Sequence, residues 1–517
     1  MVYSSVVLVI LDGFGVAPAW GGNAIIVARV PTIAGLEREP HAVLEAAGEA
    51  VGLGPNEPGN SEVGHLNLGA GRIVVQESRR ISQALADRTF FENAALIKTF
   101  AELNHSGGTL HLMGLLSPVG IHAVYAHLLG VLEMAQIKSF FRVKLHLFTD
   151  GRDSGQRDAL ALLLQLEQTL QRLGFGTIQT ISGRYYAMDR DNHWDRTKLA
   201  YEAVGFGRGQ AAASARQALS QAYAKEQTDE FINPTVVNKP GQPVYAGVQN
   251  QDVVMFFNCR ADRARQLTRA FTDSEIHETV REQLAQPFTF VSMVPYDLPG
   301  HLNHGRVVFE PPPIYHSLPA VIAERGGRQF HIAETEKWAH ITYFFNGRLE
   351  ALLPGEERLL IPSPKVPTYD TAPAMSADTI TRELVNRISR GKEQLIVANY
   401  ANADMVGHTG NFRAALLAVE VLDRQLRILA DTCQKHNVPL IITADHGNVE
   451  EMVDPQTGEV DTEHSLNPVP CYFVLPAPQR LLKARGLLAD VAPTILALLG
   501  EAIPVEMTGS SLLGEIT

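Results

Sequence analysis

The sequence predicts an α/β protein with two domains, each a mostly parallel β-sheet flanked by helices. Apolar runs of strand length alternate with loops and helical patterns along most of the chain, as in parallel strands joined by helical crossovers. The 517 residues are more than a single hydrophobic core usually supports. Glu310 is followed by a run of prolines, whose restricted backbone makes an extended linker.

The composition is typical of a soluble globular protein. Hydrophobic residues make up 45% of the chain and charged residues 19%, and the net charge of −12 argues against a surface that coats nucleic acid. The first residues carry no basic leader, and the apolar run that ends before Asp12 is too short to cross a bilayer, so we expect no membrane partner. The 3 cysteines are too few and too scattered for a disulfide framework, so we expect a reducing compartment, the cytoplasm.

The first predicted strand carries a carboxylate to the edge of a sheet. Residues 6–11 are uniformly apolar, as in strands covered on both faces, and Asp12 follows directly. Ligands of α/β sheets bind at the carboxyl ends of strands, although an Asp before Gly is also common in turns. Residues 23–48 then predict a helix followed by a short extended segment.

Ser61 follows a loop rich in Gly and Pro and starts a new element. A serine at such a position commonly caps a helix. Alternatively it acts as a nucleophile, because backbone amides and the helix dipole at a helix start favour an anion. Ser61 by itself leaves both interpretations open.

Polar residues follow the strands that we predict between residues 77 and 310, namely residues 110–116, 143–148, 177–181 and 253–257, with a helix over residues 159–173. The residues just past these strands are His122, Arg152, Asp153, Arg184, Arg190, Arg260 and Arg263. The carboxyl ends of parallel strands meet at one edge, so these side chains can converge on one crevice. A lone Arg is usually a solvated surface group, but several from separate strands favour an anion site. Arg260 and Arg263, at a predicted helix start, suit a phosphate.

The last third of the chain carries residues that suit a metal. We predict strands over residues 395–399, 439–443 and 469–475. Each of them ends at or lies beside one group of Asp and His residues, namely the pair Asp404 and His408, the pair Asp445 and His446, and the single His464. Carboxylates with neutral imidazoles suit Mn²⁺ or Zn²⁺, and the lack of thiolates argues against a structural zinc. We therefore expect these residues to bind a catalytic pair of divalent ions. The ordinary alternatives are that the single histidine is an exposed loop residue and that the Asp at a strand end caps a helix. Earlier in the same region, residues 329–332 predict a strand and residues 334–338 the start of a helix. The simplest topology folds this third together with the first 75 or so residues.

Several motifs together resemble one family. They are Asp12-Gly13-Phe14-Gly15, residues 60–72, 150–153, 183–191, 260–265 and 404–410, and Ala444-Asp445-His446-Gly447-Asn448. In order, over essentially the whole chain, they resemble cofactor-independent phosphoglycerate mutase, a two-metal enzyme of the alkaline phosphatase superfamily. The resemblance implies a phosphatase-like metal-binding domain, residues 1–76 and 311–517, split by an inserted substrate-binding transferase domain, residues 77–310. Linkers are expected near residues 74–78 and 308–313.

The resemblance also implies roles for the candidate residues. One metal ion would bind Asp404, His408 and His464, and the other Asp12, Ser61, Asp445 and His446. Ser61 would accept the phosphoryl group and Lys337 would stabilise it during transfer. The glycerate part would be held by His122, Arg152, Asp153, Arg184 and Arg190, and the phosphate by Arg260 and Arg263. Asp153 could serve as general acid or base.

The implied reaction interconverts 3-phosphoglycerate and 2-phosphoglycerate through phosphoserine, in glycolysis and gluconeogenesis. It would use two divalent ions, Mn²⁺ foremost with Mg²⁺ or Co²⁺ as alternatives, and no 2,3-bisphosphoglycerate. A small-molecule substrate, a monomer, and closure of the two domains during turnover are expected. The alternatives are a phosphatase or sulfatase of the same superfamily, a phosphopentomutase, and a metal-stabilised binding protein without catalytic activity.

Overall fold

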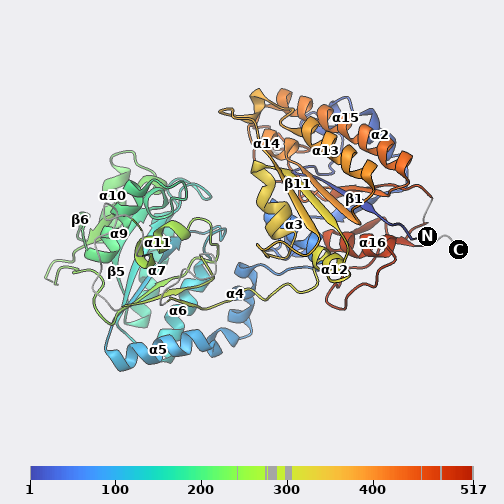
Figure 1. Ribbon diagram of the computed structural model, residues 1–517. Coiled ribbons are helices and arrows are strands. Elements are labelled where there is room, and N and C mark those ends of the chain that lie inside the picture. Colours follow the sequence, from blue (N-terminus) through green and yellow to red (C-terminus); the bar gives the residue numbers. More distant parts are fainter. Residues whose placement is uncertain are drawn as a thin grey trace. The chain divides into compact units, whose positions relative to one another are not determined.

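The computed structural model describes residues 2–241, 243–273, 276, 288–296, 305–455, 457–477 and 480–514 (Figure 1). The chain divides into two compact units. Met1–Gln76 and Pro313–Thr517 form the first, here called the split unit, and Glu77–Pro312 form the second, the inserted unit. Within the described ranges each unit contains one eight-stranded, mainly parallel sheet with flanking helices, so the predicted fold class is confirmed.

The sheet of the split unit has the order β12-β11-β13-β1-β14-β15-β2-β17. Strand β1 lies between β13 and β14 and is parallel to both, whereas β15 is antiparallel to its neighbours β14 and β2. All of β1 is buried, because its apolar residues face helices on both sides. The strands are β1 (Val6–Leu11), β2 (Ala42–Glu45), β11 (Gln329–Glu334), β12 (Glu356–Ile361), β13 (Leu395–Tyr400), β14 (Leu440–Thr443), β15 (Val469–Val474) and β17 (Arg485–Leu487), with a separate small pair β16 (Arg480–Leu481) and β18 (Leu513–Gly514).

Two groups of helices cover this sheet. The long helix α15 packs against α1, α2 and α13, while α3 packs against α12 and α16, and Figure 1 shows the two groups on opposite faces of the sheet. The helices are α1 (Ala24–Val27), α2 (Pro31–Leu36), α3 (Ser61–Ala70), α12 (Leu318–Glu324), α13 (Ala377–Arg390), α14 (Asn402–Gly407), α15 (Phe412–His436) and α16 (Val491–Leu498). Short helical turns span Gly48–Val51, Tyr369–Thr371 and Leu488–Asp490.

The sheet of the inserted unit has the order β10-β9-β8-β3-β4-β5-β7-β6, and only the β5–β7 pair is antiparallel among its described strands. The strands are β3 (Leu110–Leu116), β4 (Val143–Thr149), β5 (Thr177–Gly183), β6 (Gln210–Ala212), β7 (Thr235–Val237), β8 (Val253–Phe256), β9 (Thr289–Ser292) and β10 (Gly305–Val307). The helices are α4 (Glu77–Ala86), α5 (Ala94–Ser106), α6 (Tyr125–Ile137), α7 (Ala159–Leu173), α8 (Arg184–Ala187), α9 (Trp194–Phe206), α10 (Ala215–Tyr223) and α11 (Arg265–Thr272), with turns at Thr89–Glu92 and Asp229–Phe231.

Two local predictions were wrong. Helix α11 begins at Arg265, so Arg260 and Arg263 lie in the turn before it and not at its start. The helix expected from residue 334 is a 3₁₀ turn, Thr335–Lys337, followed by a π-helical turn, His340–Phe344. Helical periodicity does not separate these tighter and wider turns from an α-helix over so few residues.

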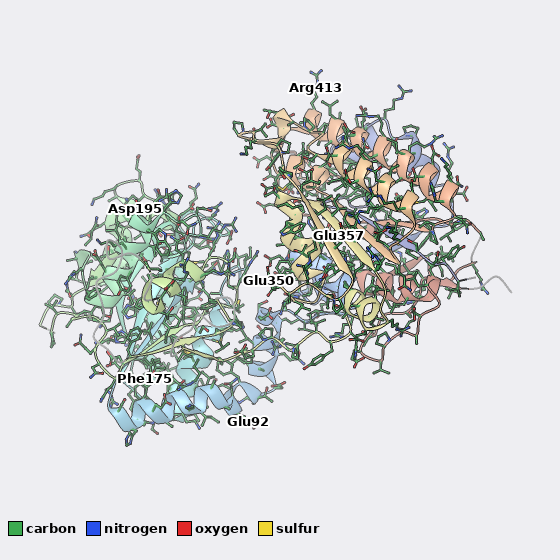
Figure 2. All side chains as sticks on the ribbon, viewed as in Figure 1. Glu92, Phe175, Asp195, Glu350, Glu357 and Arg413 are labelled. Atoms are coloured by element: carbon green, nitrogen blue, oxygen red, sulfur yellow. The ribbon has the colours of Figure 1, made fainter. Side chains whose placement is uncertain are left out.

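The long helix α15 is amphipathic, since its buried residues recur at the spacing of one helical face. Figure 2 shows the side chain of Arg413, in the first turn of α15, pointing away from the body of its unit. In the part of the chain that the structure describes, no helix has both the length and the apolar composition needed to cross a bilayer.

Candidate functional site

Ser61 is the first residue of α3, and it does not cap the helix. The cap is Asn60, whose side chain accepts a hydrogen bond from the amide of Val63 at 3.0 Å. The Ser61 hydroxyl is therefore available for other partners, and the capping interpretation of this serine is excluded.

The Ser61 hydroxyl lies where three elements of the split unit meet. Its Oγ donates to Asp12 Oδ1 at 3.1 Å, accepts from Lys337 Nζ at 2.8 Å and lies 3.0 Å from His446 Nε2. Asp12 directly follows β1, His446 comes three residues after the neighbouring strand β14 ends at Thr443, and Lys337 ends the turn after β11. All four residues are buried. The carboxyl edge of one parallel sheet thus gathers a hydroxyl, a carboxylate, an imidazole and an ammonium group.

A second group of side chains adjoins the first through Asp404. The Nε2 atoms of His408 and His464 each lie 3.2 Å from Asp404 Oδ1 and 3.0 Å from one another. The Asp404 Oδ2 atom accepts from Lys337 Nζ at 2.5 Å. The Nδ1 atom of His408 lies 2.7 Å from Thr462 O, and the Nδ1 atom of His464 lies 2.8 Å from Gly59 O. Both rings therefore turn their Nε2 atoms inward, toward Asp404.

Strong electrostatic coupling links these buried groups. Burial alone would raise the pKa of Asp12, but Lys337 and His446 hold it well below its ordinary value. Burial opposes protonation of His446, yet the carboxylates of Asp445, Asp12 and Asp404 raise its pKa to about 9. The pKa of Lys337 is raised in the same way, against burial, by Asp12 and Asp404.

The donor set fits divalent cations. Asp12, Asp445 and His446 form one group of potential ligands, and Asp404, His446 and His464 form another, each with its donor atoms within 4.8 Å of one another. Asp404 Oδ1 and Asp445 Oδ2 are buried oxygens without a hydrogen-bond donor. Buried carboxylate oxygens of this kind are costly unless a cation satisfies them. Carboxylates combined with inward-facing imidazoles are the ligands that Mn²⁺ and similar ions prefer.

Two glycines allow the backbone segments to approach this closely. A side chain at Gly64 would place its Cβ 2.5 Å from Asp445 O and 2.6 Å from Asp445 Cβ. Gly13 has φ +71° and its added Cβ would lie 2.7 Å from Asp404 Cα. Both positions therefore need a residue without a Cβ for the loops to meet around Ser61.

The inserted unit brings its own candidate residues together around two carboxylates. Arg184 donates to Asp153 and, at 2.7 Å, to Asp150 Oδ1, and His122 Nε2 lies 3.5 Å from Asp153 Oδ2. The other ring nitrogen of His122 lies 3.4 Å from Asp262.

The arginines form a dense positive cluster on this unit. Arg190 and Arg260 lie 3.1 Å and 3.3 Å from the carboxylate of Asp262, and Arg152 lies 3.7 Å from Glu230. Arg263 donates to the carbonyl of Met188 at 3.4 Å. Burial and then the like charges of Arg190, Arg184 and Arg152 lower the pKa of Arg263 to about 10. Positive charges this close repel one another, so an anion bound here would stabilise the cluster.

Comparison with known proteins identifies the chain. Residues 81–298 match the family model described as BPG-independent PGAM N-terminus. The chain is 46% identical, over 98% of both lengths, to 2,3-bisphosphoglycerate-independent phosphoglycerate mutase of Clostridium beijerinckii. It is 47% identical over 98% of both lengths to the enzyme of that name from Moorella thermoacetica.

The chain belongs to the 2,3-bisphosphoglycerate-independent phosphoglycerate mutase family. A crystal structure of Leishmania mexicana phosphoglycerate mutase at low cobalt concentration is 28% identical and covers 99% of this chain and 98% of its own, with a TM-score of 0.78. The family, the enzyme class of isomerase and the fold predicted from the sequence are therefore confirmed. The individual site residues and the identity of the metal remain predictions.

Sequence reasoning missed residues that the structure places beside the candidate residues of the inserted unit. In the inserted unit, Asp150 and Asp262 pair with the arginines of the mutase motif, and Asp262 stands in the sequence between Arg260 and Arg263. The position of a carboxylate inside an arginine-rich motif is the sequence feature that could have predicted a pairing role for Asp262. A further cluster, Asp189, Asp191 and His193, lies in the loop before α9, where Asp189 accepts from the amides of the other two.

Replacing Gly64 with Ala should damage the site while every candidate ligand keeps its own side chain. The new methyl group collides with Asp445, so we expect a loss of roughly 1–3 kcal/mol of stability and weaker Mn²⁺ binding. Urea unfolding and calorimetric titration with Mn²⁺ measure the two effects. Gly35→Ala is the matched control, because a Cβ at this helical glycine meets nothing within 4 Å. If Gly64→Ala and Gly35→Ala have the same stability and the same Mn²⁺ affinity, the close approach of α3 to Asp445 is contradicted.

Proposed function

We propose that this chain interconverts 3-phosphoglycerate and 2-phosphoglycerate through a phosphoserine formed on Ser61, without 2,3-bisphosphoglycerate. The observation that carries the proposal is the surroundings of the Ser61 Oγ, which lies 2.8 Å from an ammonium, 3.0 Å from an imidazole and 3.1 Å from a carboxylate. A buried serine oxygen with such partners is suited to act as a nucleophile, and the family membership gives the reaction.

The split unit is the proposed metal-binding unit. One ion would be held by Asp404, His408 and His464, and the other by Asp12, Ser61, Asp445 and His446. When bound, such ions lower the pKa of a hydroxyl and neutralise phosphoryl oxygens. The set of oxygen and imidazole donors favours Mn²⁺, with Mg²⁺ or Co²⁺ as alternatives.

In the proposed reaction, the Ser61 hydroxyl loses its proton and its oxygen attacks the phosphorus in line. The bond from phosphorus to the substrate oxygen breaks, and that oxygen takes up a proton as the glycerate leaves. Lys337 donates a hydrogen bond to Ser61 Oγ and compensates the charge that develops on the phosphoryl oxygens. The other glycerate hydroxyl then attacks the phosphoserine, loses its proton and restores the free serine.

The inserted unit is the proposed substrate-binding unit, which keeps the glycerate from escaping between the two steps. Arg260 and Arg263 would bind the phosphate, and the glycerate part would be held by His122, Arg152, Asp153, Arg184 and Arg190. Asp153, close to His122 and Arg184, would move protons to and from the hydroxyls. Water must be excluded, or phosphoserine hydrolysis makes the enzyme a phosphatase. Closure of the units on the linkers during turnover would serve this purpose.

We further propose that the protein works as a monomer in the cytoplasm on its small-molecule substrate. All three cysteines are described, and none forms a disulfide, which supports a reducing compartment.

Removal of the Ser61 hydroxyl tests the nucleophile. Ser61→Ala should lower kcat about 10⁴-fold or more, because no phosphoserine can form. The measurement is an enolase-coupled assay on 3-phosphoglycerate without 2,3-bisphosphoglycerate, with a chelator added in a parallel reaction. A Ser61→Ala enzyme with near wild-type turnover, or turnover that persists after chelation, contradicts the mechanism.

Mn²⁺ affinity should rise with pH. The raised pKa of His446, about 9, means that this imidazole is protonated at neutral pH in the metal-free protein and must lose its proton to bind a cation. Between pH 6.5 and 8.5 the apparent Kd for Mn²⁺ should fall up to about tenfold per pH unit for each proton released. Titration calorimetry in buffers of different ionisation enthalpy measures both the affinity and the proton release. An affinity independent of pH contradicts the assignment of His446.

Arg263→Met should weaken substrate binding. It removes one charge of the arginine cluster while keeping an apolar stem, and a charged hydrogen bond to phosphate contributes ~1.5–3 kcal/mol, so KM should rise about tenfold or more. Arg269→Met is the control, because Arg269, on α11, pairs at 3.1 Å with Asp273, the residue just after the end of that helix. Steady-state kinetics with 3-phosphoglycerate distinguish the two, and an unchanged KM in Arg263→Met removes this residue from the proposed phosphate site.

A further inference from the structure

Two buried polar side chains, Asn399 and His65, contact residues of the Ser61 site but belong to neither proposed set of metal ligands. The residues that they contact are Asp12, Ser61 and Asp445. Asn399, on the buried strand β13, donates from its Nδ2 to Asp12 Oδ2 at 2.7 Å. The same Nδ2 lies 3.0 Å from Nε2 of His65. His65 is one helical turn after Ser61 on α3, so both project from the same face. Both Asn399 and His65 are fully buried.

The hydrogen bonds determine where the His65 proton lies. An amide nitrogen has two hydrogens, and those of Asn399 face Asp12 and His65. The reversed amide would point its oxygen at the Asp12 carboxylate, which repels it. His65 Nε2 is therefore an acceptor without a proton, and the proton is on Nδ1. That Nδ1–H lies 2.8 Å from the carbonyl of Ser61 and 3.2 Å from Asp445 Oδ2.

We propose that Asn399 and His65 are positioning residues that hold Asp12, Ser61 and Asp445 in the arrangement one divalent cation requires. The bridge runs from Asp12 through the Asn399 amide and the His65 ring to Asp445 and to the first turn of α3. Asn399 lies opposite Ile10 in the β1–β13 register, two residues before Asp12, so the amide reaches the carboxylate across the sheet. The hydrogen bond from Asn399 leaves the Asp12 carboxylate only limited rotation, and the His65 ring lies against Asp445 while it donates to the carbonyl of Ser61. These contacts orient the remaining oxygen lone pairs of the two carboxylates.

The bridge acts on one of the two proposed ligand groups. Among the residues that the structure describes, no hydrogen bond joins Asn399 or His65 to Asp404, His408 or His464. The orientation of those three side chains comes from contacts with Lys337, Gly59 and Thr462. Loss of the bridge should therefore weaken the binding of one cation and leave the binding of the other unchanged. This inference rests on the proposed two-metal function.

Four variants test it, with Mn²⁺ alone as the probe. Asparagine places its amide nitrogen near the position of His Nδ1 and glutamine places its amide near Nε2, so His65→Asn keeps the donor to the Ser61 carbonyl, beside Asp445, and His65→Gln does not. We expect Asn399→Ala and His65→Gln to weaken one of two Mn²⁺ steps about 10–100-fold in titration calorimetry, and His65→Asn to weaken it less. The KM for 3-phosphoglycerate should stay within about twofold while kcat falls, because its proposed binding residues are in the inserted unit.

His331→Asn is the matched control, since His331 is an equally buried histidine of the split unit that contacts Ile341 O and Gln329 Oε1. Its Mn²⁺ steps should equal those of the wild type, and circular dichroism verifies that each variant folds. The inference is overturned if both Mn²⁺ steps are unchanged in Asn399→Ala and His65→Gln, if both steps weaken equally, or if His65→Gln and His65→Asn behave alike. Wild-type protein that binds no pair of Mn²⁺ ions contradicts the proposed function itself.

Discussion

The contact between the Ser61 hydroxyl and its three partners is the constraint on which the rest of the split unit depends. Asp12, Lys337 and His446 lie 49, 276 and 385 residues from Ser61 in the sequence, yet all reach the same oxygen. Parallel strands make this possible, because β1, β11 and β14 all deliver their next residues to one edge of the sheet. Gly13 and Gly64 then let the loops and α3 approach closely.

The site concentrates charge that a buried environment disfavours. Asp12, Asp404 and Asp445 are buried together, and Lys337 and the raised pKa of His446 supply the compensating positive charge. Removing ions from water is unfavourable unless they are paired, and two carboxylate oxygens still have no donor. A protein that keeps this arrangement gains from cations that satisfy these oxygens, which links its stability to metal binding.

The sequence predicted those parts of the fold whose residues carry a strong local pattern. The uniform apolar run of β1 and the strand β3 have the predicted bounds, and so does helix α7. The edge strand β12, with the sequence EERLLI, was missed because its polar half lacks the apolar run of a buried strand. The strands β6, β7 and β10 have only three residues each, too few for a period to be recognised.

The candidate site was predictable where a polar residue stands one or two positions after an apolar strand, as for Asp12 and Asp445. Ser61 needed the structure, since only the cap at Asn60 shows that its hydroxyl has other partners. Asn399 was missed because it lies inside a buried strand, where an amide is counted as part of the core pattern. Asp262 was missed because the surrounding arginines dominate the motif. Pairing across the sheet and between loops is absent from local sequence patterns, so these contacts require the folded chain.

The central claim is that side chains from distant parts of the chain hold two cations around one serine oxygen. Anomalous diffraction from crystals grown with Mn²⁺ measures this most directly. The account predicts two peaks, one coordinated by Asp12, Ser61, Asp445 and His446 and the other by Asp404, His408 and His464. A single peak, or peaks remote from Ser61 such as one at the Asp189 cluster, would contradict it.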